Sequence, residues 1–343
     1  MTSRERFLRA VDHKDLDRLP RDFVSEGPVA ESLIKALNLA DINALKDKFK
    51  VDLEYVRVQI RCPYDDGRNI WGMKYSSAGL TENVSLHPLA DATTVEDVDA
   101  HPWPSPDWAD IDAFKAEAEI ARNTGRAVSG STWGSIFGEA YRLMGMDNFM
   151  MGLVLYPDVV HRIIEHLTNF FLEVDRRIFE SCKGLIDITY HGNDFGTQRG
   201  LLFSREMWFD FYSAPLKKLF DQSHAYGLRP MFHSCGAVSE LIDDLVGIGV
   251  EILDPVQNTA EGMNPKILKD KYGDKVAFHG CVSAQKVLPL GTPDEVREHV
   301  KEICDVMKPG SGYIFSSDQA ITQDTPTENV IAMYEAVEEY GNY

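Results

Sequence analysis

Two short segments carry the side chains best suited to binding a transition metal. The first is FHSCG, with His233 and Cys235, and the second is HGC, with Cys281. Both end runs typical of buried β-strands, in which residues two apart share a face, so His233 and Cys235 should project together. One imidazole and two thiolates prefer Zn²⁺ to Mg²⁺ or Ca²⁺. Three protein ligands would leave one coordination position open for a reactant.

An ordinary structural interpretation of the same residues stays open. A His-x-Cys pair can be a hydrogen-bonded histidine beside a buried thiol, and Cys281 can fill a small gap in the core. The two cysteines lie far apart in the chain, so they do not form a compact zinc motif.

A second row of polar residues lies on the predicted strand over residues 185–191 and just after it. Four of them alternate with apolar residues: Asp187, Thr189, His191 and Asn193. This alternation predicts that the polar set faces the interior of the fold. His191, Asn193 and the adjacent Asp194 are therefore candidates for acid–base catalysis, with a structural hydrogen-bond network as the alternative.

Candidate substrate-binding residues come from predicted strand ends and from the loop GNDFGTQRG. Aromatic residues can form the walls of an apolar pocket, although single aromatic residues more often belong to the core. Arg199 could bind a substrate carboxylate or pair with a surface acid. The full set is Trp133, Tyr190, Gln198, Arg199, Gln257 and Asp318.

These residues need a fold that brings strand ends together. Eight runs rich in β-branched and aromatic residues alternate with helical stretches, over residues 19–25, 53–60, 127–133, 185–191, 230–235, 251–256, 276–282 and 313–317. Strands that alternate with helices predict a parallel sheet, and eight repeats predict a (β/α)8 TIM barrel, with a doubly wound open sheet as the alternative. In such a barrel the active site lies at the C-terminal ends of the strands.

Cap and turn residues predict where the helices lie. An N-terminal helix covers residues 3–11, and proline in the first turn begins further helices at residues 157–181, 293–307 and 326–340. A helix over residues 204–226 should be kinked by Pro215. Residues 61–110 are longer than a plain connection needs, so we expect an inserted hairpin and loop near the barrel mouth. The whole of residues 1–343 is predicted to be one domain.

Composition excludes several classes of partner. The formal net charge of −19 repels nucleic acid and anionic membranes. No run approaches the roughly 18 apolar residues that a membrane span needs. The five cysteines are odd in number and widely spread, which favours a reducing compartment, and the charged N-terminal residues do not resemble a signal peptide. The sequence therefore predicts a cytoplasmic protein.

The chain resembles the uroporphyrinogen decarboxylase superfamily over nearly its whole length. The resemblance includes SRERFLRAVDHKDLDRLP, HGNDFGTQRGLLFSREMWFDFYSAPLKKL, FHSCGAV and GYIFSSDQAITQDTPTENVIAMYEA, and it implies a (β/α)8 barrel. Decarboxylases of that superfamily carry an Arg-rich segment of the form R-P-x-W-x-M-R-Q-A-G-R, whereas this chain reads RLPRDFVSEGPVAES there. The resemblance is therefore to the cobalamin-dependent methyltransferase branch.

Within that branch, the resemblance implies Zn²⁺ bound by a His-x-Cys pair, here His233 and Cys235. Thiol-methylating members have a further cysteine near the last strand, where this chain reads IFSSDQ. Cys281, or else Asp318, would then supply the third ligand. The chain has no room for a corrinoid-binding domain, so the resemblance implies a cobalamin carried on a separate corrinoid protein.

Together these features predict a zinc-dependent methyltransferase. It would move a methyl group between a small methylated compound, such as a methyl ether, and a corrinoid protein, with His191 or Asp194 delivering a proton. The alternative is a decarboxylase or lyase for a small carboxylic acid, in which Arg199 anchors the carboxylate and Asp194 handles the proton. A non-catalytic binding barrel with a structural metal is a third interpretation. A homodimer is compatible with the sequence.

Overall fold

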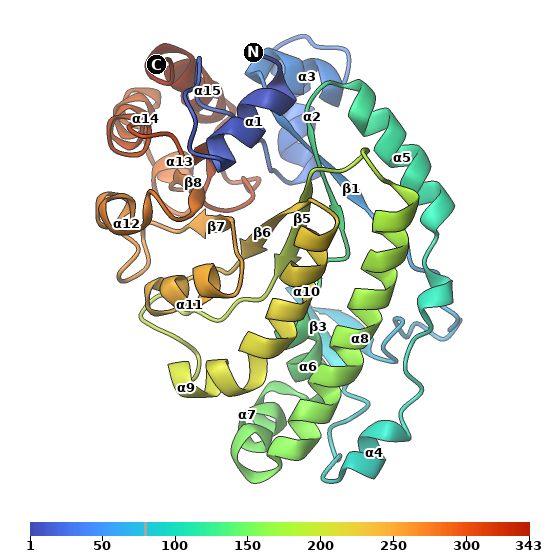
Figure 1. Ribbon diagram of the computed structural model, residues 1–343. Helices are drawn as coiled ribbons and strands as arrows, with labels where there is room; N and C mark the ends of the chain where they lie inside the picture. The colour runs from blue at the N-terminus through green and yellow to red at the C-terminus, as the bar shows by residue number, and fades with distance from the viewer. Residues whose placement is uncertain (79–80) are drawn as a thin grey trace.

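Seven parallel strands form one curled sheet in the computed structural model, which describes residues 1–78 and 81–343 (Figure 1). The strands are β1 (Leu53–Arg57), β4 (Ala127–Ser131), β5 (Ile188–Gly192), β6 (Arg229–His233), β7 (Ile252–Val256), β8 (Ala277–Val282) and β9 (Tyr313–Ser317). They lie side by side in this order, each parallel to the next. The sequence located each of them to within three residues at either end.

The first predicted strand, residues 19–25, closes the sheet without being a regular strand. Arg21 forms an isolated parallel bridge with Phe315 of β9. On the other side, the backbone N–H of Asp52, just before β1, donates to the carbonyl of Arg21 at 2.8 Å. The segment therefore lies between the first and last strands of the sheet, and the barrel fold predicted from the sequence is confirmed.

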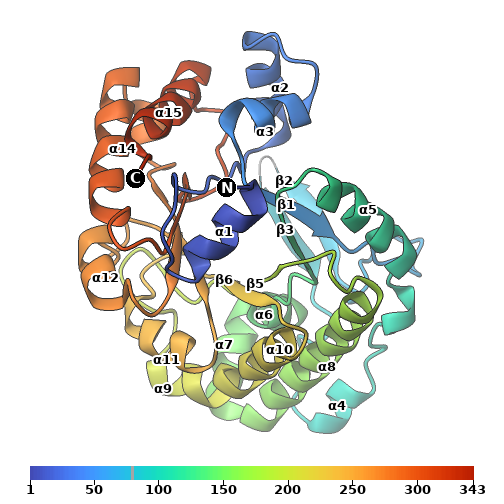
Figure 2. The same cartoon turned by 45° about the horizontal axis from the view of Figure 1, so that its top comes forward.

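One apolar side chain from each strand fills the barrel at the N-terminal ends of the strands. These seven residues belong to one buried cluster: Leu53, Ala127, Ile188, Met231, Ile252, Ala277 and Ile314. Phe7 and Val11 of α1 (Ser3–Val11) join the cluster. Helix α1 therefore crosses and plugs this end of the barrel (Figure 2), which leaves the opposite end for a site.

Two residues further along every strand, the inward-facing residue is a serine, aspartate, histidine or tyrosine. Because side chains alternate along a strand, these positions share the face of the apolar cluster. The seven residues, which we call the polar layer, are Tyr55, Ser129, Tyr190, His233, Asp254, His279 and Ser316. Asp254 hydrogen-bonds to three other members, so these side chains do meet inside the barrel. The polar layer is the floor of the barrel mouth.

The helices form the outer layer around the sheet (Figure 2). Their bounds are α2 (Gly27–Ala36), α3 (Ile42–Phe49), α4 (Val95–Asp99), α5 (Ile111–Asn123), α6 (Ile136–Met144), α7 (Met146–Leu155), α8 (Pro157–Ser181), α11 (Ile242–Gly247), α12 (Pro265–Tyr272), α13 (Val287–Leu290), α14 (Pro293–Met307) and α15 (Thr327–Tyr340). Helices α1, α8 and α14 have the predicted bounds. Among the described helices, none combines the length and the apolar character needed to cross a bilayer.

The helix predicted over residues 204–226 is interrupted just before Pro215. It consists of α9 (Arg205–Trp208), a π-helical turn (Phe209–Ser213) and α10 (Ala214–Ala225). Proline has no N–H to donate, and its ring crowds the preceding turn, so the backbone widens there. The kink predicted from the sequence is therefore a local widening of one turn.

The predicted insert contains a two-stranded antiparallel hairpin, β2 (Lys74–Ala78) and β3 (Thr81–Leu86). Its base is closed by an isolated bridge between Ile60 and Ala109. Trp103 stacks on His166 of α8, with ring centroids 4.5 Å apart. The insert is therefore anchored to the outside of α8 as well as to the end of β1.

Candidate metal site and active site

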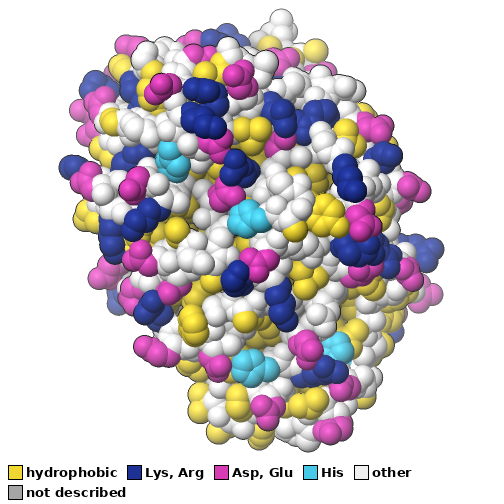
Figure 3. All heavy atoms as spheres, viewed as in Figure 1, with side chains coloured by type: hydrophobic (Ala, Val, Ile, Leu, Met, Phe, Trp, Pro, Cys, Tyr) yellow, Lys and Arg dark blue, Asp and Glu magenta, His cyan; other side chains and the backbone are white. Residues whose placement is uncertain are grey.

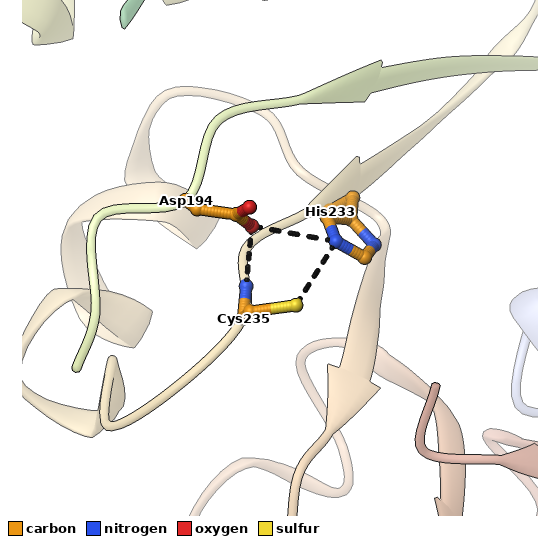
Figure 4. A group of neighbouring side chains, drawn as sticks. All are labelled: Asp194, His233 and Cys235. Carbon is orange, nitrogen blue, oxygen red and sulfur yellow. Dashed lines mark hydrogen bonds and ion pairs between the residues drawn. The ribbon is translucent and has the colours of Figure 1, made fainter. Parts of the chain in front are cut away.

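Three side chains with metal-binding atoms meet where β5 and β6 end (Figure 4). His233 Nε2 lies 3.2 Å from Cys235 Sγ and 3.4 Å from Asp194 Oδ1. The backbone N–H of Cys235 donates to Asp194 Oδ1 at 2.9 Å. His233 and Cys235 are half-buried and Asp194 is exposed, so the group is accessible from the barrel mouth.

The spacing of these atoms fits a tetrahedral metal centre. With metal–ligand bonds of ~2.0 to ~2.3 Å, the ligand atoms of such a centre lie ~3.3 to ~3.6 Å apart. The distances from His233 Nε2 to the other two ligand atoms are close to this range. One imidazole, one thiolate and one carboxylate are all ligands that zinc accepts, and three protein ligands leave a fourth position for a reactant.

Two glycines let the loops approach closely enough to build this group. Gly236, which follows Cys235, has a φ of +87°, and a Cβ there would lie 2.6 Å from the backbone of Gly196. The N–H of Ala237 donates to the carbonyl of Thr197 at 2.7 Å. The segment after β6 is thus fixed against the segment after β5, which carries Asp194.

The second nitrogen of His233 is held by a buried carboxylate. His233 Nδ1 lies 2.6 Å from Asp254 Oδ2, and the Tyr190 hydroxyl donates to the same oxygen at 2.5 Å. His279 Nδ1 lies 2.5 Å from the other oxygen of Asp254. A carboxylate that accepts from Nδ1 leaves the Nε2 lone pair free for a metal and fixes the orientation of the ring.

The network continues across the barrel from His279. Its Nε2 lies 3.1 Å from Asp22 Oδ2, which also accepts a hydrogen bond from the Tyr55 hydroxyl at 2.6 Å. Burial disfavours a charged imidazole, but the carboxylates of Asp254 and Asp22 outweigh it and raise the pKa of His279 to about 9. Burial also opposes ionisation of Asp254, yet the two histidines hold its pKa well below the usual range. His279 is therefore an imidazolium between two carboxylates.

The structure does not bring Cys281 to this group. Gly280 and Cys281 both have positive φ angles, of 100° and 77°, so the alternation of side chains on β8 ends at His279. The Cys281 thiol packs in the core and hydrogen-bonds to Tyr313, and burial raises its pKa far above the ordinary value. Asp194 stands where the sequence placed Cys281 as the third ligand.

The face predicted for β5 is reversed. Ile188 belongs to the interior cluster, whereas Thr189 Oγ1 donates to Ser223 of α10 at 3.0 Å. His191 is fully buried outside the sheet, with its Nε2 3.9 Å from Asp175 Oδ2 of α8. Because the buried ring lies toward α8 and α10 and not toward the barrel interior, His191 is not placed to act as a catalytic acid.

Asn193 and Asp187 also have structural roles. Asn193 Oδ1 accepts from the N–H of Phe137 at 2.7 Å, so the amide orders the start of α6. Asp187 is buried and forms ion pairs with Arg4 and Arg122 at the opposite end of the barrel from the site. Neither side chain is available to a reactant.

Trp133 and Tyr190 are the two predicted substrate-binding residues that adjoin the metal-ligand group. The Trp133 ring lies 4.9 Å from that of Tyr190 and 5.4 Å from that of His233, centroid to centroid. Gly192 makes room for Trp133, since a Cβ there would lie 2.0 Å from its ring. Both aromatic residues line a cavity of about 150 Å³, together with Tyr55 and Arg57.

The other four predicted substrate-binding residues do not line this cavity. Gln257 is buried, and its Oε1 accepts from the N–H of Gly236 at 2.8 Å, so it supports the loop of Cys235. Asp318 is buried, and its Oδ1 accepts from the N–H of Ala284 at 2.8 Å. Gln198 and Arg199 are exposed on the loop after β5.

Several residues of the site were missed by sequence reasoning. Asp254, His279 and Asp22 form the support behind His233, and Gln319 Nε2 donates to the sulfur of Cys235 at 3.0 Å. The sequence could have indicated a role for Asp254, because a metal-binding histidine nearly always donates its other ring N–H to a carboxylate, a carbonyl or water. Arg57 also lies two residues after Tyr55, on the same face of β1.

The chain is therefore a parallel (β/α)8-barrel protein with candidate metal ligands at the C-terminal ends of its strands. The family described as uroporphyrinogen decarboxylase (URO-D) matches residues 87–340. The chain therefore belongs to the uroporphyrinogen decarboxylase family.

Individual relatives are distant. A uroporphyrinogen decarboxylase of Coxiella burnetii is 22% identical over 188 residues, which cover 54% of this chain and 48% of that protein. One of Methylococcus capsulatus is 23% identical over 186 residues, covering 54% and 50%. The chain thus spans about half the length of these curated relatives. Among solved structures, a methyltransferase from Methanosarcina mazei has the same fold, with a TM-score of 0.73, 18% identity and 99% of both chains covered.

Proposed function

We propose that the chain is a zinc-dependent methyltransferase that moves a methyl group between a small methylated compound and a separate corrinoid protein. The observation that supports this most is the group of Asp194, His233 and Cys235 beside a small aromatic cavity. When bound, Zn²⁺ would supply a Lewis acid next to the compound whose methyl bond is broken or formed. Asp194, His233 and Cys235 would hold it.

The surrounding residues prepare this corner of the mouth. Asp254 fixes the His233 ring, so that Nε2 faces Asp194 and Cys235. The Tyr190 hydroxyl donates to Asp254, which leaves its oxygen able to accept a hydrogen bond at the edge of the cavity. Trp133 covers Tyr190 and His233 and reduces the access of water to them.

Two further observations support methyl transfer over porphyrin decarboxylation. A methyltransferase shares the fold over the full length of the chain. The Arg-rich segment expected of a porphyrin decarboxylase is replaced by RLPRDFVSEGPVAES. All five cysteines are free, which suits the reducing cytoplasm that we also propose as its location.

Metal analysis of the purified protein tests the proposal. We expect about one zinc per chain in the wild type, and its loss in the His233→Ala and Cys235→Ala variants. Cys62→Ala is the matched control, because Cys62 is an exposed free thiol in the insert. Equal zinc content in Cys235→Ala and Cys62→Ala would remove the proposed site.

A second candidate function is decarboxylation of a small carboxylic acid. It is favoured by the curated relatives, which are uroporphyrinogen decarboxylases, and by Arg57, a cationic residue that lines the cavity. The two functions differ in product: one transfers a methyl group to or from a corrinoid protein, and the other releases CO₂. Carbon dioxide release that persists in His233→Ala and Cys235→Ala would favour the decarboxylase.

A further inference from the structure

The cavity beside β1 comes from a difference in side-chain size between β1 and its neighbour β4. Tyr55 and Arg57 of β1 face inward above Leu53 and pair in register with Ser129 and Ser131 of β4. The serines are too small to fill the space that a larger pair of residues would occupy. The result is the cavity of about 150 Å³, with Arg57 on its rim.

Arg57 has no ionic or hydrogen-bond partner for its guanidinium within residues 1–78 and 81–343. Most arginines of the chain do have one; Arg4 and Arg122, for example, both bind Asp187. On the face shown in Figure 3, basic and acidic side chains are interspersed. The chain has 54 acidic and 35 basic residues, so carboxylates are not scarce. A guanidinium left unpaired beside a cavity is therefore available to an anionic ligand.

Two other arginines in the described part of the chain, Arg61 and Arg199, also have a guanidinium without a hydrogen bond or ion pair. Arg9, by contrast, has no carboxylate partner but donates to the carbonyl of Asp15. Neither Arg61 nor Arg199 lines the cavity. Arg199 was the carboxylate-binding candidate in the sequence, but it lies exposed on the loop after β5. Among the described arginines, Arg57 is thus the one that both has an unpaired guanidinium and lines the cavity.

The cavity also has a direction. Arg57 comes from β1, whereas Trp133 follows β4 and Tyr190 comes from β5. Strand β5 lies next to the β6 of His233, and both aromatic side chains contact the ring of that histidine. A planar compound between these aromatic side chains would present one end to Arg57 and the other to the metal-ligand group. Aromatic walls favour a ring or a flat conjugated group over a flexible chain.

We infer that Arg57 binds the carboxylate of the substrate, so that the small methylated compound is a planar aromatic acid. This inference rests on the proposed function only for the methyl group, since anion binding can be measured without methyl transfer. A carboxylate matches the guanidinium in two parallel hydrogen bonds, which a neutral amide of the same shape cannot reproduce with equal strength.

Calorimetric titration of the purified protein with benzoate and benzamide tests this assignment. We expect the wild type to bind benzoate more tightly than benzamide, and Arg57→Gln to lose about 10- to 100-fold in benzoate affinity with little change for benzamide. Arg57→Lys keeps the charge without the two-pronged geometry and should be intermediate. Arg199→Gln, an exposed arginine without a carboxylate partner in the described chain, is the matched control.

Three results would overturn the assignment: no benzoate binding by the wild type, equal benzoate affinity in the wild type and Arg57→Gln, or an equal loss in Arg199→Gln. Tighter binding of benzenesulfonate than benzoate would overturn the choice of carboxylate. Because Arg57 is exposed, unchanged melting temperatures should accompany these variants. A protein that prefers benzoate through Arg57 but contains no zinc would refute the proposed metal chemistry and leave this assignment in place.

Discussion

Replacing Asp254 with asparagine tests whether the polar layer holds His233 in its metal-binding orientation. One carboxylate oxygen accepts from His233 Nδ1 and from the Tyr190 hydroxyl, and the other accepts from His279 Nδ1. Three donors therefore converge on two oxygens. An asparagine has one accepting oxygen, and its amide nitrogen can only donate.

The geometry allows two orientations of that amide, and each one loses an interaction. If the amide oxygen faces His233 and Tyr190, the amide nitrogen faces the N–H of His279. If the amide is turned over, His233 Nδ1 loses its acceptor and the ring can rotate away from Cys235. Loss of such a support typically lowers metal affinity ~10- to ~100-fold, or about 1.4 to 2.8 kcal/mol. His279 would also remain buried with less negative charge around it, which should cost about 3 kcal/mol or more in unfolding free energy.

Competition between the protein and a chromophoric zinc chelator measures the first effect, and thermal unfolding measures the second. Asp318→Asn is the matched control, because Asp318 is another buried carboxylate at the end of a strand and binds the N–H of Ala284. Burial raises the pKa of Asp318 to about 7, so a neutral replacement should be well tolerated there. Unchanged zinc affinity in a folded Asp254→Asn protein would refute the role assigned to the polar layer.

Three further variants probe individual residues. Cys281→Ala should keep its zinc and lose about 1 to 2 kcal/mol of stability, because the thiol is buried in the core; metal analysis and urea unfolding check both. Asp194→Ala should bind zinc at least ~10-fold more weakly at nearly unchanged melting temperature, since Asp194 is exposed. Burial raises the pKa of Asp175 to about 8 from 3.8, so the folded state keeps a proton that the unfolded chain loses, and stability falls as pH rises through this range. Burial lowers the pKa of His191 to about 4 from 6.5, so above about pH 7 this imidazole is neutral in both the folded and the unfolded chain and does not change the pH dependence of stability. Asp175→Asn should therefore flatten the fall in urea midpoint between about pH 7 and pH 8.

Local signals predicted the helices because caps and prolines act within a single turn. Thr292, for example, accepts from the N–H of Glu295 while the Glu295 side chain accepts from the N–H of Thr292, directly before the predicted start of α14. Residues 19–25 are different. Their hydrogen bonds go to β9 and to Asp52, so whether they form a ladder or isolated bridges is decided by distant parts of the chain.

The face of β5 was predicted incorrectly because polarity was taken as the mark of the interior. The N-terminal layer of a barrel is filled by bulky apolar side chains, and Ile188 supplies one of them. The polar residues on the other face find partners on helices: Thr189 binds Ser223, and His191 lies near Asp175. Those partners come from α10 and α8, so no pattern within the strand reveals them.

A comparison between strands would have given the right face. In all seven strands an apolar inward residue is followed two positions later by a serine, tyrosine, histidine or aspartate, as in Met231–His233, Ile252–Asp254 and Ala277–His279. Ile188–Tyr190 fits the same pattern, whereas His191 does not. Aligning β5 with its neighbours would therefore have placed Tyr190, and not His191, beside His233.

The third ligand depends on which strands are neighbours. Adjacent parallel strands lie ~4.8 Å apart, so residues from β6 and β8 start ~10 Å apart, and side chains could close that gap only if β8 stayed extended to Cys281. The positive φ angles at Gly280 and Cys281 prevent this. A residue from a directly adjacent strand has half the distance to cover. His233 of β6 has a carboxylate from each neighbour: Asp194, after β5, lies near Nε2, and Asp254 of β7 accepts a hydrogen bond from Nδ1. Strand order and the backbone conformation at Gly280 and Cys281 together explain why carboxylates, and not the second thiol, flank this histidine.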